Sequence, residues 1–293
     1  MKATHRWAGL CLALLAFSPL PGGEPAPAGP APEASIRLIV RADDMGSSHA
    51  ANAACIRAFK EGIVRSVEVM APAAWFPEAA ALLAENPGLD VGVHLTLTSE
   101  WDACKWGPLT RAPSLSDADG YFFPTTSQRS DFPPGTGFLQ AKPKLDEVER
   151  ELRAQIELCR RKIRGVSHLS VHMGTATATP ELRAIVEKLS SEYKLPLDPA
   201  GARHFSGFPW KAGADEKVRA LVKGLEGLQP GLWIFVEHPG MDVPEMRAMG
   251  HEGYRDVAAD REGVTRAFTS KEVKDAIERR GIQLVSYGDA LKR

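Results

Sequence analysis

Short apolar runs alternate along this chain with longer segments in which apolar residues recur every three or four positions. The short runs are typical of buried strands and cover 36–40, 66–72, 90–98, 165–174, 195–198, 232–240 and 282–287. The periodic segments predict amphipathic helices over 50–62, 76–84, 144–163, 180–193, 214–225 and 269–280. The segment 241–267 is polar and lacks this period, so we expect it to be irregular.

This order of elements indicates an α/β fold. Strands and helices that alternate through short connections form a parallel sheet, which is either open or closed into a barrel. The chain shows no internal repeat and no second compositional regime. We therefore predict one domain of about seven strand–helix units, as a single (β/α) barrel rather than an open sheet.

A long segment, 99–143, interrupts the alternation after the third predicted strand. It contains Trp101, Trp106 and the run Pro133-Pro134-Gly135. Such a long segment without regular structure inside a compact domain is usually a functional loop. Because it follows the third strand, it would lie over the same end of the barrel as Asp43 and Asp44, which end the first strand. Its aromatic side chains either stack on sugar rings or pin the loop to the domain, since amphipathic aromatics serve both purposes.

Composition narrows the functional classes. The chain is 44% apolar and 25% charged, with a net charge of −1. This is the composition of a globular protein, and without a basic stripe it gives no support to nucleic-acid binding.

The N-terminus has the layout of a secretory signal. Lys2 and Arg6 precede an apolar run over 7–17 that is followed by prolines and glycines. We predict a signal peptide over 1–28, a Pro/Ala-rich leader over 29–34 and the barrel domain over 35–293. The apolar run is too short to span a membrane, so we expect export to the periplasm or the outside of the cell.

The cysteines do not form a complete disulfide framework. Cys11 lies in the predicted signal peptide, which leaves three. Cys55 and Cys159 lie on apolar helix faces and are expected in the core. Cys104 lies in the long loop, and whether it forms a disulfide stays open.

Ionisable side chains lie near the carboxyl ends of four predicted strands: Asp43 and Asp44, His94, His172 and His238. Ligand sites of parallel α/β folds lie at that end of the sheet. Adjacent carboxylates there need a cation or a shared proton, unless one caps the next helix and the other faces water. Two histidines and a carboxylate suit a divalent metal. His168 shares the side of His172 and is expected one layer deeper, as a support or core residue.

Seven segments, in order along the chain, resemble the YdjC-like carbohydrate deacetylases of the ChbG/HpnK family: 41–46, 62–70, 88–98, 114–122, 167–174, 238–240 and 281–287. The resemblance implies a seven-stranded, TIM-like (β/α) barrel that removes N-acetyl groups from sugars. It implies that Asp44, His94 and His172 bind a divalent metal, zinc or magnesium first, with cobalt, nickel and manganese as alternatives. It also implies that Asp43 is the catalytic base. The chain departs from many members at Ser170, where they carry Asp, and at 173–176, where they are rich in His.

The leading hypothesis is an exported metal-dependent hydrolase whose partner is an acetylated amino sugar, oligosaccharide or polysaccharide. Asp43 would take a proton from the attacking water, and His238 is the candidate acid for the departing amine. In the structural alternative His238 supports the strand–loop junction, and His49 is similarly ambiguous. An exported glycoside hydrolase, which needs two carboxylates facing each other across a sugar, and a non-catalytic sugar-binding barrel remain as alternatives.

Overall fold

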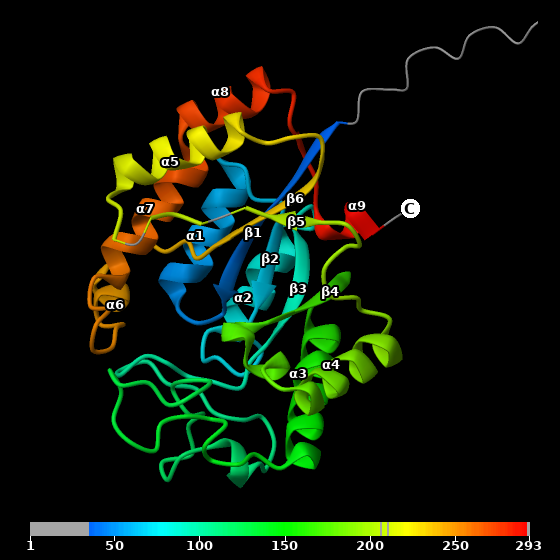
Figure 1. Ribbon diagram of the computed structural model, residues 1–293, viewed down its shortest axis with the longest axis vertical. Helices are drawn as coiled ribbons and strands as arrows, with labels where there is room; N and C mark the ends of the chain where they lie inside the picture. Colours follow the sequence, from blue (N-terminus) through cyan, green and yellow to red (C-terminus); the bar gives the residue numbers. More distant parts are fainter. Residues whose placement is uncertain (1–34, 206, 210, 292–293) are drawn as a thin grey trace, which may run out of the picture. The chain divides into compact units, whose positions relative to one another are not determined.

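The alternating elements fold into one parallel sheet flanked by helices (Figure 1). The computed structural model describes residues 35–205, 207–209 and 211–291. Within these residues the strands are β1 (Ile36–Met45), β2 (Ser66–Val69), β3 (Asp90–Leu95), β4 (Val166–Val171), β5 (Arg203–His204), β6 (Gly231–Glu237) and β7 (Gln283–Leu284). The sheet order is β4-β3-β2-β1-β6-β5, and β7 pairs with β1. The predicted signal peptide and leader, 1–34, lie outside the described residues.

The sheet is open, so the prediction of a closed, seven-stranded TIM-like barrel was wrong. At one edge β4 pairs with β3, at the other β5 pairs with β6, and no ladder joins β4 to β5 within the described residues. The reason is local: the expected strand over 195–198 does not form, and only one backbone bond, Leu169 N–H to Pro196 O at 2.9 Å, links it to β4. The result is a curled half-barrel.

Helices cover the sheet as the periodicity predicted, and the described residues contain three more. The helices are α1 (His49–Lys60), α2 (Phe76–Glu85), α3 (Leu145–Lys162), α4 (Pro180–Tyr193), α5 (Ala214–Glu226), α6 (Pro244–Arg247), α7 (Val257–Thr269), α8 (Lys271–Arg279) and α9 (Tyr287–Leu291). The three that the periodicity did not predict are α6, α7 and α9. The segment 241–267, predicted to be irregular, contains α6 and most of α7. Two short 3₁₀ segments, Pro113–Leu115 and His172–Thr177, complete the described elements.

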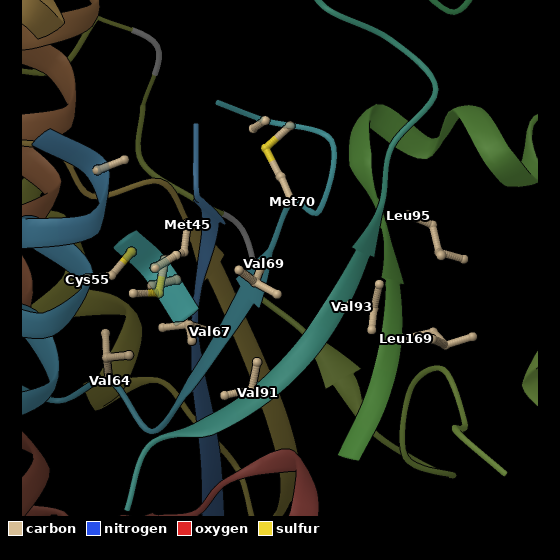
Figure 2. Close-up of a cluster of buried hydrophobic side chains, with 14 of the residues drawn as sticks. Met45, Cys55, Val64, Val67, Val69, Met70, Val91, Val93, Leu95 and Leu169 are labelled. Carbon is tan, nitrogen blue, oxygen red and sulfur yellow. The ribbon is translucent and has the colours of Figure 1, made fainter. Parts of the chain in front are cut away.

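The two faces of the sheet differ in chemistry. Alternate residues of β2, β3 and β4 pack into the main apolar core with α1, α2 and α3 (Figure 2). These are Val67, Val69, Val91, Val93, Leu95 and Leu169. Because successive side chains of a strand point to opposite faces, the residues between them face the other way, and several are polar: Glu68, His94, His168 and Ser170. A small apolar cluster that includes Ile39, Ile234 and Tyr287 completes the core.

The cysteines match the sequence prediction where it was definite. Cys55 and Cys159 are buried in the core. Cys104 is half-buried, and none of the three described cysteines forms a disulfide. No helix in the described part of the chain is both long and apolar enough to cross a membrane.

Candidate metal centre

A β-bulge turns both adjacent aspartates toward the same site. Across the β1–β2 ladder, Ala42 pairs with Val67 and Met45 with Val69, so Asp43 and Asp44 together lie opposite Glu68. Asp44 has a φ of 66°, in the left-handed region that Asp tolerates better than most residues. A regular strand would have pointed the two carboxylates to opposite faces.

Neither aspartate caps α1. Ser48 is its N-cap residue, and the Ser48 side chain accepts a hydrogen bond of 3.0 Å from Ala51 N–H. The interpretation in which one aspartate is a helix cap is therefore wrong, and both carboxylates are available to the site.

Asp44, His94 and His172 come together from three strand ends. His172 Nδ1 lies 3.2 Å from Asp44 Oδ1, and His94 Nε2 lies 3.6 Å from the same oxygen. One ligand atom from each residue lies within 4.8 Å of the others. The three residues are 1%, 2% and 3% exposed, in sequence order.

In each of the two histidines one ring nitrogen faces Asp44, and the other ring nitrogen is held by an oxygen on the opposite side of the ring. His94 Nδ1 lies 2.7 Å from Ser170 Oγ, and His172 Nε2 lies 3.0 Å from Glu100 Oε2. Histidines that bind metals are usually oriented in this way by an oxygen behind the ring. Glu100 comes from the long loop after β3, where the residues have no periodic pattern that would predict its position.

The polar atoms of this cluster fit a divalent cation. Arg261 donates to Asp44 Oδ2 at 2.8 Å, whereas Asp44 Oδ1 is buried and, among the described residues, accepts no hydrogen bond of good geometry, although His172 Nδ1 lies 3.2 Å away. Such a buried anionic oxygen beside two imidazole nitrogens is costly unless a positive charge lies close to it. Two imidazoles and one carboxylate are a donor set that zinc and similar ions accept, and three protein ligands leave coordination positions for water and substrate.

The two imidazoles have opposite pKa shifts. Burial lowers the pKa of His94 to about 4, so its ring is neutral at neutral pH. Burial acts in the same direction on His172, but the charges of Glu100 and Asp44 outweigh it and raise the pKa of His172 to about 10. Without a metal, a protonated His172 therefore offsets part of the negative charge of Glu100 and Asp44.

Asp43 lies beside this cluster and is fixed by an arginine. Arg41 Nε and Nη2 donate to the two oxygens of Asp43 at 2.7 and 2.8 Å. Asp43 Oδ2 lies 3.7 Å from His94 Nε2, on the ring edge that faces Asp44. Two parallel hydrogen bonds from one arginine fix the orientation of a carboxylate.

His238 lies at the same edge of the sheet but outside the three-residue cluster. Glu237, the last residue of β6, pairs with Ala42, which brings His238 level with Asp43. Its side chain is 41% exposed. His238 and Arg261 both line a cavity of about 290 Å³.

The other singled-out side chains have structural partners. His168 is buried below His94 and His172, against Glu68. His49 is largely exposed and bonds to Glu78 instead of reaching the cluster. Trp101 and Trp106 are buried, which favours loop-pinning over sugar-stacking for these two rings.

Comparison with known proteins adds independent information. The family model described as "YdjC-like protein" matches residues 37–279. A carbohydrate deacetylase of Thermus thermophilus is 33% identical over 72% of this chain and 80% of its own length. A chitooligosaccharide deacetylase of Yersinia pestis is 30% identical over 86% of this chain and 98% of its own length.

A solved structure agrees with this match. A protein of Enterococcus faecalis, named for cellobiose-phosphate cleavage, is 26% identical and superimposes with a TM-score of 0.71 over 87% of this chain and 98% of its own. The family model covers most of the present chain, including β1, the bulge and both histidine-bearing strand ends. The chain therefore belongs to the YdjC-like protein family.

Proposed function

We propose that this chain is a metal-dependent hydrolase that removes N-acetyl groups from an amino sugar or from an oligo- or polysaccharide that contains one. The observation that carries the proposal is the buried cluster of Asp44, His94 and His172, with the buried Asp44 Oδ1 at its centre. The deacetylase names of the relatives support the reaction class.

The residues around the cluster have the properties that amide hydrolysis requires. A divalent ion on Asp44, His94 and His172 would polarise the acetamide carbonyl and lower the pKa of a water molecule. Asp43, held by Arg41, is the base that accepts the proton of the attacking water. His238 is the acid that protonates the departing amine. Burial lowers the pKa of His238, but the opposing effects of its neighbours, the charge of Asp44 first among them, are larger together. The net result is a raised pKa, which favours the protonated form.

The donor set also favours one group of metals. Magnesium prefers oxygen ligands in octahedral geometry, whereas imidazole suits zinc, cobalt and nickel. We therefore place zinc first, with cobalt, nickel and manganese as alternatives, ahead of magnesium.

The glycoside-hydrolase alternative has less support. That reaction needs two carboxylates on opposite sides of a sugar, about 5 Å or more apart. Asp43 Oδ2 and Asp44 Oδ1 both lie within 3.7 Å of one atom, His94 Nε2, so they share one side of the site.

The decisive experiment measures acetate release from a panel of N-acetylated glycans. The chain is stripped with a chelator, reloaded with Zn²⁺ and compared with Asp43→Asn, which leaves the three proposed ligands intact. We expect acetate from the reloaded wild type, little from the stripped form, and little from Asp43→Asn despite normal zinc content. Cleaved glycosidic bonds without acetate, or no turnover of any glycan by the loaded protein, would reject the proposal.

Export is a second part of the proposal. It rests on the charged, apolar and Pro/Gly-rich order of the first residues of the chain. N-terminal sequencing of the protein recovered from the periplasm or medium should begin near residue 29, and recovery of the full chain from the cytoplasm would contradict it.

A further inference from the structure

A line of buried polar groups extends behind the His94 ring, from β3 through β4 to β2. His94 Nδ1 lies 2.7 Å from Ser170 Oγ, and this hydroxyl donates a short hydrogen bond to Glu68 Oε2. The other carboxylate oxygen, Oε1, lies 2.5 Å from His168 Nε2. All four side chains are buried, so bulk water does not compete for these contacts.

The single proton of the Ser170 hydroxyl sets the direction of this line. Because Ser170 donates that proton to Glu68, its oxygen accepts from His94, and His94 Nδ1 carries a proton. A neutral imidazole protonated at Nδ1 has its lone pair at Nε2. Nε2 is the ring atom that faces Asp44.

Glu68 is suited to be the final acceptor of this line. Burial alone would raise the pKa of its carboxyl, but His168 and then Arg41, whose Nε lies 3.9 Å away, lower that pKa to about 2. Space for the carboxylate comes from Gly92, because a Cβ there would lie 2.2 Å from Glu68 Oε2. The carboxylate is therefore ionised and confined to one position.

We propose that Glu68, acting through the Ser170 hydroxyl, is a positioning residue for His94. It fixes the Nδ1–H tautomer and makes Nε2 a stronger ligand for a divalent cation. This inference rests on the proposed metal site and deepens it. A carboxylate behind a ligand imidazole is a common support; here it lies on a neighbouring strand and acts across a hydroxyl.

The test is a Zn²⁺ competition titration of the purified chain against a chromophoric chelator. It compares wild type with Ser170→Ala, Glu68→Gln and the double variant. Each single change should weaken zinc binding by about 10–100-fold, the usual effect of losing such a support. The double variant should bind no more weakly than the weaker single variant, because both changes break the same line. Additive losses, or single variants with wild-type affinity, would overturn the proposal.

Two control variants separate positioning from general damage. Glu151→Gln removes another fully buried carboxylate, one that accepts from Leu109 N–H at 3.0 Å, and should leave zinc affinity unchanged. Ser170→Thr keeps the hydroxyl and should bind zinc nearly as wild type does. If Glu68→Gln does not fold, the comparison of Ser170→Ala with Ser170→Thr still tests the role of the hydroxyl. Equal zinc affinities of these two variants would refute the proposal.

A spectroscopic measurement tests the tautomer directly, without metal or substrate. Long-range ¹H–¹⁵N NMR of the metal-free wild type should show His94 protonated at Nδ1, and Ser170→Ala should shift its population toward the other tautomer. An unchanged tautomer in Ser170→Ala would contradict the inference. A different outcome would separate the two proposals. If the variants weaken zinc binding as expected but the zinc-loaded wild type releases no acetate, the proposed reaction is refuted and the positioning role of Glu68 stands.

Discussion

Replacing Gly92 with alanine should destabilise the chain, because the added methyl group would clash with two buried side chains on the polar face of the sheet, Glu68 and His168. The added Cβ would lie 2.2 Å from Glu68 Oε2 and 2.5 Å from His168 Nε2. The first distance is more than 1 Å short of the 3.4 Å at which ordinary van der Waals contact begins. Neither group can move into water, because both side chains are fully buried.

The size of the effect follows from these contacts. Overpacking a well-packed interior costs roughly 1–3 kcal/mol, and leaving a buried polar group without its hydrogen-bond partner costs about 1–3 kcal/mol. We therefore expect the free energy of unfolding to fall by about 3 kcal/mol, the upper end of either range. For a domain of this size that corresponds to a decrease in Tm of roughly 6–12 °C.

The assay is urea unfolding of the metal-free chain, followed by its midpoint at unchanged m value. Gly88→Ala is the matched control, because a Cβ there would meet only the Phe59 ring, at 3.5 Å. That substitution should change stability by less than about 1 kcal/mol, since glycine-to-alanine changes without strain have small effects. If Gly92→Ala were as stable as Gly88→Ala, the placement of Glu68 and His168 against β3 would be wrong.

Three further predictions concern the cluster itself. Asp44→Asn keeps a residue that tolerates the left-handed φ, so the backbone of the bulge should be unchanged. This variant should lose zinc binding in a competition titration, and retained zinc would remove Asp44 from the ligand set. Arg261→Ala leaves Asp44 buried without its arginine and should lower the free energy of unfolding of the metal-free protein by about 3–5 kcal/mol. Thermal unfolding should show a smaller loss of stability when Zn²⁺ is bound, and equal losses with and without Zn²⁺ would count against charge compensation at Asp44. Glu100→Gln should weaken zinc affinity by about 10–100-fold, and wild-type affinity would show that Glu100 does not support His172.

The convergence of Asp44, His94 and His172 was predictable from sequence because it depends on strand direction alone. Parallel strands place their carboxyl ends at one edge whether the sheet closes or stays open. The error about barrel closure therefore did not disturb the position of these residues. The three side chains lie at or just after the carboxyl ends of β1, β3 and β4, as the apolar runs predicted.

The residues that support the cluster were not predictable in the same way. Glu100 lies in a loop without any period, so its distance from His172 depends on tertiary packing. Arg261 lies on α7 at a position of the apolar series Val257, Val264 and Phe268, and a charge in that series made the segment look irregular. The burial of Arg261 could be predicted only if Asp44 were already known to be its hydrogen-bond partner.

The polar network distinguishes this open sheet from the interior of a closed barrel. The interior of a closed (β/α) barrel is filled by layers of branched apolar side chains. Here the corresponding positions of β2 and β4 carry Glu68, His168 and Ser170, which need hydrogen-bond partners from outside their own strands. Tyr287 supplies part of that cover, since its ring stacks on His168 at 4.0 Å and its hydroxyl accepts from Arg41.

The polar face of the sheet corresponds to a period of two in the sequence of its strands. Over 66–69, 90–95 and 168–171 apolar residues alternate with polar residues or glycine, whereas strands buried on two apolar faces have continuous apolar runs. Alternation of this kind predicts a sheet with one polar face, and in the interior that face must be satisfied by side chains from other elements. Tyr287 begins a C-terminal helix, α9, whose first residues bond to the amino ends of two strands: Tyr287 N–H donates to Ser66 Oγ at 3.0 Å, and Gly288 N–H donates to Asp90 Oδ2 at 3.1 Å. The polar face of the sheet is thus covered at the amino ends of its strands by a helix, and the Tyr287 ring stacks on His168 there.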